Sequence, residues 1–232
     1  MLHCRLEKLK QCLFVCMCSI ADCSSLLDLE FVLDSSGSVA TSHFDVAKEL
    51  VVSVVNELDV RIDRTRIGLI YWSHDAFVAF NMIDYGQVKQ DVVEAIRRVP
   101  FLSNATHTAA ALRLVHDTAF QPHSGDRDGV PNVAILVSDG HSNVLSDLTP
   151  FQAYTCRIND IRMVAVGFGN SINIAELSTI ASRPLTHNLF TNPRTFVFEN
   201  FIAAIIGSTC NGTNLSLFLI IIIIIIIIII II

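Results

Sequence analysis

The chain has 232 residues, of which 52% are apolar, and its formal net charge at neutral pH is −6. A domain usually takes roughly 100 to 200 residues, so the length allows one ordinary domain between two unusual ends. The acidic balance, the lack of a basic stripe and the lack of zinc-type cysteine spacing together exclude a nucleic-acid-binding module.

The first 21 residues are typical of a secretory signal peptide. Three basic residues precede a short apolar stretch from 12 to 20, and small residues stand at positions 19 and 21, which a signal peptidase would read. The stretch is too short to span a membrane. A structural N-terminal strand or a mispredicted start of the gene are the alternatives.

Apolar patterns then predict alternating strands and helices. Residues 26–33 predict a buried strand, which ends in the turn-rich run from Asp34 to Ser38. Residues 44–58 show the three-and-four spacing of an amphipathic helix. Residues 66–72 predict a second strand with a hairpin partner at 76–82, and residues 88–99 predict a second helix that Pro100 ends.

The same alternation continues to the end of the domain. A third helix is expected to turn Leu112, Val115 and Ala119 inward, and wholly apolar strands are expected at 133–137 and 163–166. Helical patterns cover 148–159, 173–181 and 199–208. We therefore expect a doubly wound α/β fold over residues 23–210, a Rossmann-like three-layer sandwich whose mostly parallel central sheet has helices on both faces.

The last segment, 211–232, has a polar junction and an apolar tail. Asn211 and Asn214 begin glycosylation sequons, and we expect both to be glycosylation sites. From 215 onward the chain is apolar except for one serine, and it closes with 13 isoleucines. Eighteen such residues just suffice to cross a bilayer, which indicates a membrane anchor or a lipid-anchor signal. A translated nucleotide repeat explains the run equally well.

Seven cysteines are present, and four of them lie in the expected signal peptide. Of the remaining three, Cys23 and Cys210 flank the domain, and we expect a disulfide between them that leaves Cys156 unpaired. The alternative is three reduced thiols in a cytosolic protein.

Oxygen-bearing side chains follow the strands that end at the carboxyl edge of the expected sheet, where ligands bind in such folds. Two carboxylates and three hydroxyls, without a thiolate, suit Mg²⁺, Mn²⁺ or Ca²⁺ and not zinc or copper. Alternate spacing in the first loop lets every second side chain point at one cation, and Gly37 is expected to permit the tight path. The expected metal ligands are Asp34, Ser36, Ser38, Thr106 and Asp139.

Three motifs in order carry a resemblance to the von Willebrand factor A-type domain, which covers roughly residues 25–210. They are FVLDSSGSV at 31–39, THTAAAL at 106–112 and LVSDG at 136–140, and VAVGFG at 164–169 resembles the family's late strand. The chain departs from the pattern at Asn104-Ala105, where two glycines commonly precede the threonine, and this puts the usual loop conformation in doubt.

The resemblance implies a metal ion-dependent adhesion site. Ser36, Ser38 and Thr106 are similar to its direct hydroxyl ligands, while Asp34 and Asp139 hold the ion directly or through water. The family's secreted members bind matrix proteins or collagen and are not enzymes, so the resemblance implies a secreted adhesion protein whose partner is an extracellular protein. A cell-surface protein anchored by its tail is the alternative localisation.

Three other interpretations of these residues compete with adhesion. Asp34 and Asp139 taken singly resemble helix N-caps, because aspartate is a preferred N-cap residue. An aspartate after a first strand can also be a phosphoryl-accepting nucleophile, although Ser36 stands where such enzymes generally have their acid–base carboxylate. A structural scaffold that does not use the metal face is the third.

Overall fold

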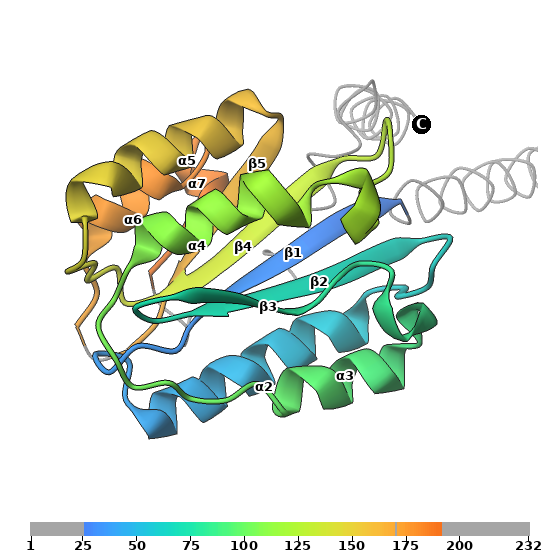
Figure 1. Cartoon of the computed structure of the whole chain (residues 1–232), viewed down its shortest axis with the longest axis horizontal. Helices are drawn as coiled ribbons and strands as arrows, with labels where there is room; N and C mark the ends of the chain where they lie inside the picture. Colours follow the sequence, from blue (N-terminus) through green and yellow to red (C-terminus); the bar gives the residue numbers. More distant parts are fainter. Residues whose placement is uncertain (1–25, 170, 192–232) are drawn as a thin grey trace, which may run out of the picture. The chain divides into compact units, whose positions relative to one another are not determined.

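In the part of the chain that the structure describes, six strands form one sheet in the order β3-β2-β1-β4-β5-β6, and only β3 runs antiparallel to its neighbour (Figure 1). The structure is a computed structural model and describes residues 26–169 and 171–191. The strands are β1 (Leu27–Asp34), β2 (Thr65–Trp72), β3 (Ala76–Phe80), β4 (Asn132–Ser138), β5 (Ile161–Gly167) and β6 (Leu189–Phe190).

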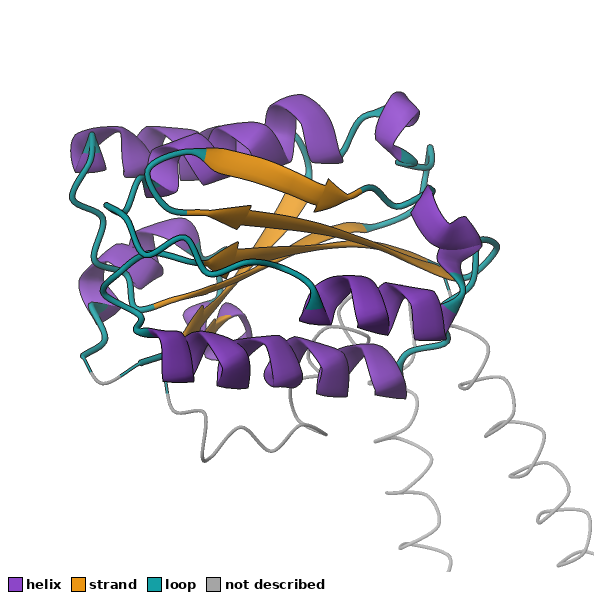
Figure 2. Cartoon of the chain, turned by 60° about the horizontal axis from the view of Figure 1, so that its bottom comes forward, coloured by secondary structure: helices purple, strands orange, loops and turns teal. Residues whose placement is uncertain are grey.

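Helices cover both faces of this sheet, as Figures 1 and 2 show from two directions. On one side lie α2 (Thr41–Glu57) and α3 (Lys89–Arg97), and on the other lie α4 (Thr108–Leu114), α5 (Thr149–Ile158) and α6 (Ile174–Ile180). A short helix, α7 (Leu185–Asn188), precedes β6. The predicted three-layer α/β architecture is confirmed.

The central strand β1 is buried along its whole length because it pairs with β2 on one side and β4 on the other. Leu29, Phe31 and Leu33 alternate along it with residues on the opposite face, where Val32 joins the core formed beneath α4, α5 and α6. A strand covered on both faces needs apolar residues on both, which explains why the sequence shows a continuous apolar run instead of alternation.

The third predicted helix has an irregular second half. α4 ends at Leu114, and the chain continues as a π-helical turn from Val115 to Ala119. The N–H of the next residue, Phe120, donates to Val115 O over 3.3 Å. The three residues predicted to face inward are all buried. Apolar spacing therefore identified the buried face. A single turn is too short for this spacing to distinguish a π-helical turn from an α-helical one.

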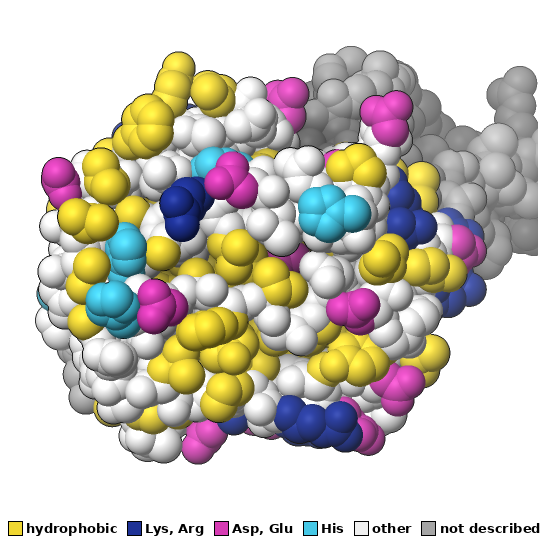
Figure 3. Space-filling view, viewed as in Figure 1, with side chains coloured by type: hydrophobic (Ala, Val, Ile, Leu, Met, Phe, Trp, Pro, Cys, Tyr) yellow, Lys and Arg dark blue, Asp and Glu magenta, His cyan; other side chains and the backbone are white. Residues whose placement is uncertain are grey.

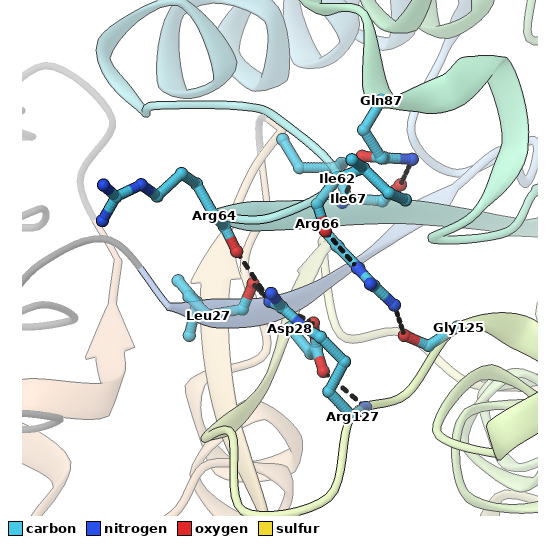
Figure 4. A network of polar contacts seen from close by, with 9 residues as sticks. All are labelled: Leu27, Asp28, Ile62, Arg64, Arg66, Ile67, Gln87, Gly125 and Arg127. Atoms are coloured by element: carbon cyan, nitrogen blue, oxygen red, sulfur yellow. Dashed lines mark hydrogen bonds and ion pairs between the residues drawn. The ribbon is translucent and has the colours of Figure 1, made fainter.

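An ion pair lies at the amino end of β1 (Figure 4). Asp28 is fully buried, and its Oδ1 accepts from Nη2 and Nε of Arg127 at 2.7 and 2.9 Å. The same guanidinium donates to the carbonyl oxygens of Leu27 and Arg64. Burial raises the pKa of Asp28, and the hydrogen bonds from Arg127 act against that rise. This contact ties the loop before β4 to the start of β1.

Gln87 takes the place of a neighbouring strand beside β2 (Figure 4). Its side-chain Oε1 accepts from Ile67 N at 2.7 Å, and its Nε2 donates to Ile67 O at 3.1 Å. The pairing between β2 and β3 begins only at Leu69, so this amide satisfies the strand edge that β3 does not reach.

Several predictions concern residues outside the described ranges. These are the signal peptide, the Cys23–Cys210 disulfide, the sequons at Asn211 and Asn214, the helix at 199–208 and the apolar tail. Within the described part, Cys156 is a free, buried thiol whose Sγ lies 3.4 Å from Leu112 O, and burial raises its pKa to about 12. No helix among the described residues is long and apolar enough to cross a membrane.

Candidate metal centre

The sheet register brings two of the predicted ligands to one edge. β1 and β4 are parallel and adjacent, with Leu33 opposite Val137, so Asp34 at the end of β1 lies beside Ser138 at the end of β4. Asp139 follows directly. The carboxyl ends of adjacent parallel strands share an edge, which is why residues more than a hundred positions apart meet here.

Asp34 is held by hydrogen bonds from both sides. Ser138 Oγ donates to its Oδ2 at 2.6 Å, and the backbone N–H of Ser36 donates to its Oδ1 at 2.9 Å. Ser138 Oγ in turn accepts from Gly140 N at 2.9 Å. The carboxylate is 1% exposed, so these contacts fix its orientation within the strand ends.

The loop after β1 presents two hydroxyls together. Ser36 Oγ and Ser38 Oγ lie 3.1 Å apart, and Ser36 is buried whereas Ser38 is exposed. Two hydroxyl oxygens at this distance can serve as neighbouring ligands of one cation. The structure thus brings two of the expected ligands into direct contact.

Hydrogen bonds fasten the loop that carries Thr106 to the loop that carries Ser36. Gly37 N donates to Asn104 O at 2.9 Å, and Ser103 N donates to Ser35 O at 2.9 Å. Ser35 Oγ adds two further bonds, donating to Pro100 O and accepting from Leu102 N. The segment lacks the two glycines common in the family, yet it lies along the first loop.

Thr106 is buried at the beginning of α4, and its backbone is paired with the loop after β4. Its N–H donates to Asn143 Oδ1 at 2.9 Å, and its carbonyl accepts from the N–H groups of Asn143 and Val144. Thr106 therefore stands between the first loop and the loop that follows Asp139. The three segments that carry the five predicted ligands are joined at one edge of the sheet.

Two buried carboxylates lie near each other at this edge. The pKa of Asp34 is raised to about 6, mainly by burial and also by the neighbouring charge of Asp139, while hydrogen bonds from Ser138 and Ser36 act against the rise. In the described ranges neither carboxylate forms an ion pair with a lysine, arginine or histidine. Within the described residues, no basic side chain therefore neutralises the negative charge of these two carboxylates.

These residues fit a hard divalent cation. Two carboxylates supply the opposite charge and three hydroxyls supply neutral oxygen ligands, which is the donor chemistry of Mg²⁺, Mn²⁺ and Ca²⁺. No cluster of three or more histidine, cysteine, aspartate or glutamate side chains that could hold a metal occurs among the described residues. The candidate site depends on its hydroxyls instead.

Neither aspartate acts as a helix cap. Asp34 binds Ser36 N, and Asp139 Oδ1 accepts from His141 N at 3.0 Å, whereas α2 has Ala40 at its N-cap position with no side-chain bond. The capping interpretation of these two carboxylates is therefore wrong.

The expected role of Gly37 is also wrong. This glycine does not have a positive φ, and a Cβ built on it would meet Ser103 O and Asn104 O at ordinary contact distances of 3.6 and 3.7 Å. Gly140, directly after Asp139, has a φ of +77°, and a Cβ there would lie 2.8 Å from Asn173 O. The glycine that the site geometry requires is the second one.

Sequence reasoning missed two polar residues near the site. Ser138 binds Asp34, and Glu176 on α6 accepts from Ser142 N at 3.2 Å. Burial is the largest cause of the raised pKa of Glu176, and the charge of Asp139 contributes to it. Ser138 could have been found from its place beside Asp139 at a strand end, but no local pattern points to Glu176.

Comparison with known proteins places this arrangement in a family. The family profile of the von Willebrand factor type A domain matches residues 28–204. The collagen alpha-4(VI) chain of Mus musculus is 30% identical over 190 residues, which cover 81% of this chain and 8% of that protein. Matrilin-1 of Gallus gallus is 32% identical over 166 residues, which cover 72% of this chain and 33% of that protein.

Solved structures show the same fold at lower identity. Proximal thread matrix protein 1 from the mussel byssus, with a zinc-occupied metal ion-dependent adhesion site motif, has a TM-score of 0.71 and 18% identity, covering 79% of this chain and 49% of that one. The manganese-loaded TRAP protein of Plasmodium vivax has a TM-score of 0.67 and 18% identity, covering 79% and 73%.

This chain spans between 8% and 36% of the length of the curated relatives that it matches. The matched region nevertheless contains the described sheet from Asp28 onward and all three segments of the candidate site. The chain belongs to the von Willebrand factor type A domain family.

Proposed function

We propose that this chain binds an acidic group of an extracellular protein through a divalent cation at the carboxyl edge of its sheet. The observation that carries the proposal is a pair of neighbouring buried carboxylates that have no basic partner among the described residues, beside hydroxyls from the first loop and from the loop of Thr106. The residues proposed to hold the cation are Asp34, Ser36, Ser38, Thr106 and Asp139.

Each part of the site has a separate task in this proposal. Asp34 is oriented by Ser138 and Ser36, so its free lone pairs keep a fixed direction. Ser36 and Ser38 offer adjacent hydroxyl oxygens, and the exposure of Ser38 leaves the site open to solvent on its side. When bound, the cation would supply an open coordination position to a carboxylate of the ligand protein.

The same geometry supports binding over catalysis. A phosphoryl-accepting aspartate must be reached by its substrate, but Asp34 is 1% exposed and both of its oxygens accept hydrogen bonds. The residue two positions later is Ser36, which has no carboxylate for acid–base work. We therefore propose that this chain is not an enzyme.

The relatives support a matrix protein as the partner. Collagen VI chains and matrilin-1 are among the proteins that this chain resembles, at 30 to 32% identity. Together with the signal-like first 21 residues, this supports a secreted protein that contacts collagen or another matrix protein. The acidic chain is not proposed to bind nucleic acid, and membrane attachment would involve only the tail.

A metal titration with the full chain tests the proposal. After treatment with chelator, free Mn²⁺ is measured by electron paramagnetic resonance, with Mg²⁺, Ca²⁺ and Zn²⁺ as competitors, because a structural neighbour carries zinc at its adhesion site. We expect one Mn²⁺ per chain, lost in Asp139→Ala and kept in Asp63→Ala, which removes an exposed acid elsewhere.

Adhesion is tested separately on a surface coated with collagen VI. We expect binding in Mg²⁺ or Mn²⁺ and none in excess chelator, and we expect Asp139→Ala to stay folded because the site lies at the solvent edge of the sheet. Full binding in chelator, or by the Asp139→Ala variant, would contradict the proposal.

A further inference from the structure

Helix α5 has apolar side chains on two opposite faces. Ala153 and Cys156 point inward and are fully buried against the rest of the core. Phe151, Tyr154 and Ile158 point outward and are 63%, 55% and 59% exposed. A surface helix normally places polar residues on its outer face, so a second apolar face indicates that this helix is covered by something else.

The outer face continues toward the amino end of the helix as one strip. Leu148 is 41% exposed and ends the short turn Ser146–Leu148 that precedes α5. Leu145, the residue before this turn, is 55% exposed. Figure 3 shows hydrophobic side chains along this side of the molecule, over the position of α5 in Figure 1. We name this surface the α5 strip, and it consists of Leu145, Leu148, Phe151, Tyr154 and Ile158.

The α5 strip carries no charge, but Asp147 is exposed at its amino end, and Arg183 and Asp160 are exposed beyond its carboxyl end. Arg157 is the one charged residue within α5, and its guanidinium turns away to donate to the carbonyls of Thr179 and Ile180 at 2.9 and 2.8 Å. Asp147 is exposed at the amino end of the strip. At the carboxyl end Arg183 is exposed and close enough to Arg157 to lower its pKa, although burial is the larger cause.

We propose that the α5 strip is the contact between two copies of this chain, with their α5 helices packed antiparallel about a two-fold axis. Antiparallel packing places Asp147 of each copy beside Arg183 of the other, so the opposite charges at the ends of the strip pair twice. The same axis brings Phe151 and Tyr154, near the middle of the strip, against the partner's copies of these residues. A two-fold contact of this kind is self-complementary and closed.

The size and composition of the strip suit such a contact. Its five side chains expose roughly 500 Å², whereas a standard interface buries about 800 Å² on each partner. The strip would therefore form the apolar centre of the interface, and the polar residues around it would form the rim. Exposed aromatic residues without charges are typical of interface centres. Because the chain is acidic overall, an uncharged contact also avoids bringing like charges together.

The pairing would affect how ligands are bound, and this part rests on the proposed function. The strip begins just after the loop that follows Asp139, at the carboxyl edge of the sheet. In an antiparallel pair the two carboxyl edges would face away from each other, so one dimer would present two metal centres in opposite directions.

Sedimentation equilibrium of the full chain tests the pairing. We expect a concentration-dependent dimer for the wild type, and at least a tenfold higher dissociation constant for Phe151→Ser/Tyr154→Ser, since two central aromatic side chains are lost. The matched control Val46→Ser/Ile62→Ser removes apolar side chains of similar exposure from other surfaces and should leave the dimer unchanged. Circular dichroism checks that each variant is folded.

A charge exchange tests the antiparallel geometry. Asp147→Arg alone and Arg183→Asp alone should each weaken the dimer, because each places two like charges at both ends of the contact. An equimolar mixture of the two variants should regain it, since every pair in the mixed dimer again has opposite charges. A wild type that is still monomeric at about 100 µM would overturn the proposal.

Two further results would also overturn it. An unchanged dimer in Phe151→Ser/Tyr154→Ser would show that another surface, such as the apolar tail, joins the copies. Failure of the mixture to regain the dimer would reject antiparallel packing. Neither result bears on Mn²⁺ binding, so failure here is distinguishable from failure of the proposed metal centre.

Discussion

Ser138 at the end of β4 donates its hydroxyl hydrogen to Asp34 at the end of β1 over 2.6 Å, and both side chains are almost fully buried. This bond crosses between two strands that lie 104 residues apart in the chain. Through this bond the third segment of the candidate site fixes the orientation of a side chain in the first.

Removing that hydroxyl should weaken both the metal centre and the fold. In Ser138→Ala, Asp34 loses the bond that fixes its Oδ2, and we expect the affinity for Mn²⁺ to fall about tenfold or more, as for other residues that orient metal ligands. The free energy of unfolding in chelator should fall by about 1 to 3 kcal/mol. Titration and urea unfolding measure the two effects, with Ser146→Ala as the exposed control. An unchanged Mn²⁺ affinity would show that Ser138 does not position Asp34 for metal binding.

Two glycines beside the site should respond differently to alanine. Gly140→Ala forces a side chain into a positive φ and within 2.8 Å of Asn173 O, so we expect it to cost more than about 1 kcal/mol of stability and to displace Asp139. Gly37→Ala meets only ordinary contacts and should retain stability and Mn²⁺ binding. Urea unfolding and Mn²⁺ titration of both variants check this, and equal effects would contradict the structure of the first loop.

A buried glutamate on β1 should make stability fall as pH rises. Glu30 is 1% exposed, it lies between Gly68 and Ala134 on the neighbouring strands, and its Oε1 has no hydrogen-bond partner among the described residues. Burial raises its pKa well above the ordinary value of 4.5. The folded chain therefore holds this proton more tightly than the unfolded chain does, so the stability it contributes is complete below pH 4.5 and is lost as pH rises through the folded-state pKa.

Glu30→Gln should remove that dependence, because an amide is neutral at every pH. We expect the variant to gain free energy of unfolding over the wild type between acidic and mildly alkaline pH, by about 1.4 kcal/mol for each unit by which burial raises the pKa. Urea unfolding at several pH values in chelator measures the difference, and Glu57→Gln on the exposed face of α2 is the control. Parallel curves for the wild type and Glu30→Gln would contradict this prediction.

Asn104 begins a third sequon, Asn104-Ala105-Thr106, within the loop beside the metal centre. Its side chain is exposed, while its carbonyl accepts from Gly37 N. A glycan there would stand where a ligand must approach, so we expect Asn104 to be mostly unmodified in secreted protein, and Asn211 to be modified if the tail reaches the lumen. Glycopeptide analysis measures occupancy. High occupancy of Asn104 together with collagen VI binding equal to that of Asn104→Gln would show that Thr106 or the ligand is misplaced.

The sheet and the candidate ligands could be predicted because they depend on local patterns and one general rule. Continuous apolar runs indicate strands covered on both faces, and the carboxyl ends of such strands share an edge. Asp34 and Asp139 could therefore be placed together from the sequence. The antiparallel hairpin of β2 and β3 and the inward face of α4 likewise follow from apolar spacing.

Features that depend on contacts distant in sequence could not be predicted in this way. Glu176 approaches the site from α6, and Gln87 replaces a strand partner 20 residues away, and neither contact has a local signature. The two-residue strand β6 is too short to show a pattern. Gly37 shows the opposite error. The motif led us to expect a backbone conformation that only glycine adopts, but the conformation of Gly37 does not require a glycine.

The ion pair between Asp28 and Arg127 has a mechanical consequence. It anchors the first strand, which is also paired on both sides along its length. Among the described residues, β6 is an edge strand joined to β5 over two residues only. If tension is applied across the described segment, as between a surface and a bound fibre, the load meets a strong attachment at one end and a weak one at the other. We expect rupture to begin at β6 and to leave β1, with Asp34 at its end, in place until higher force.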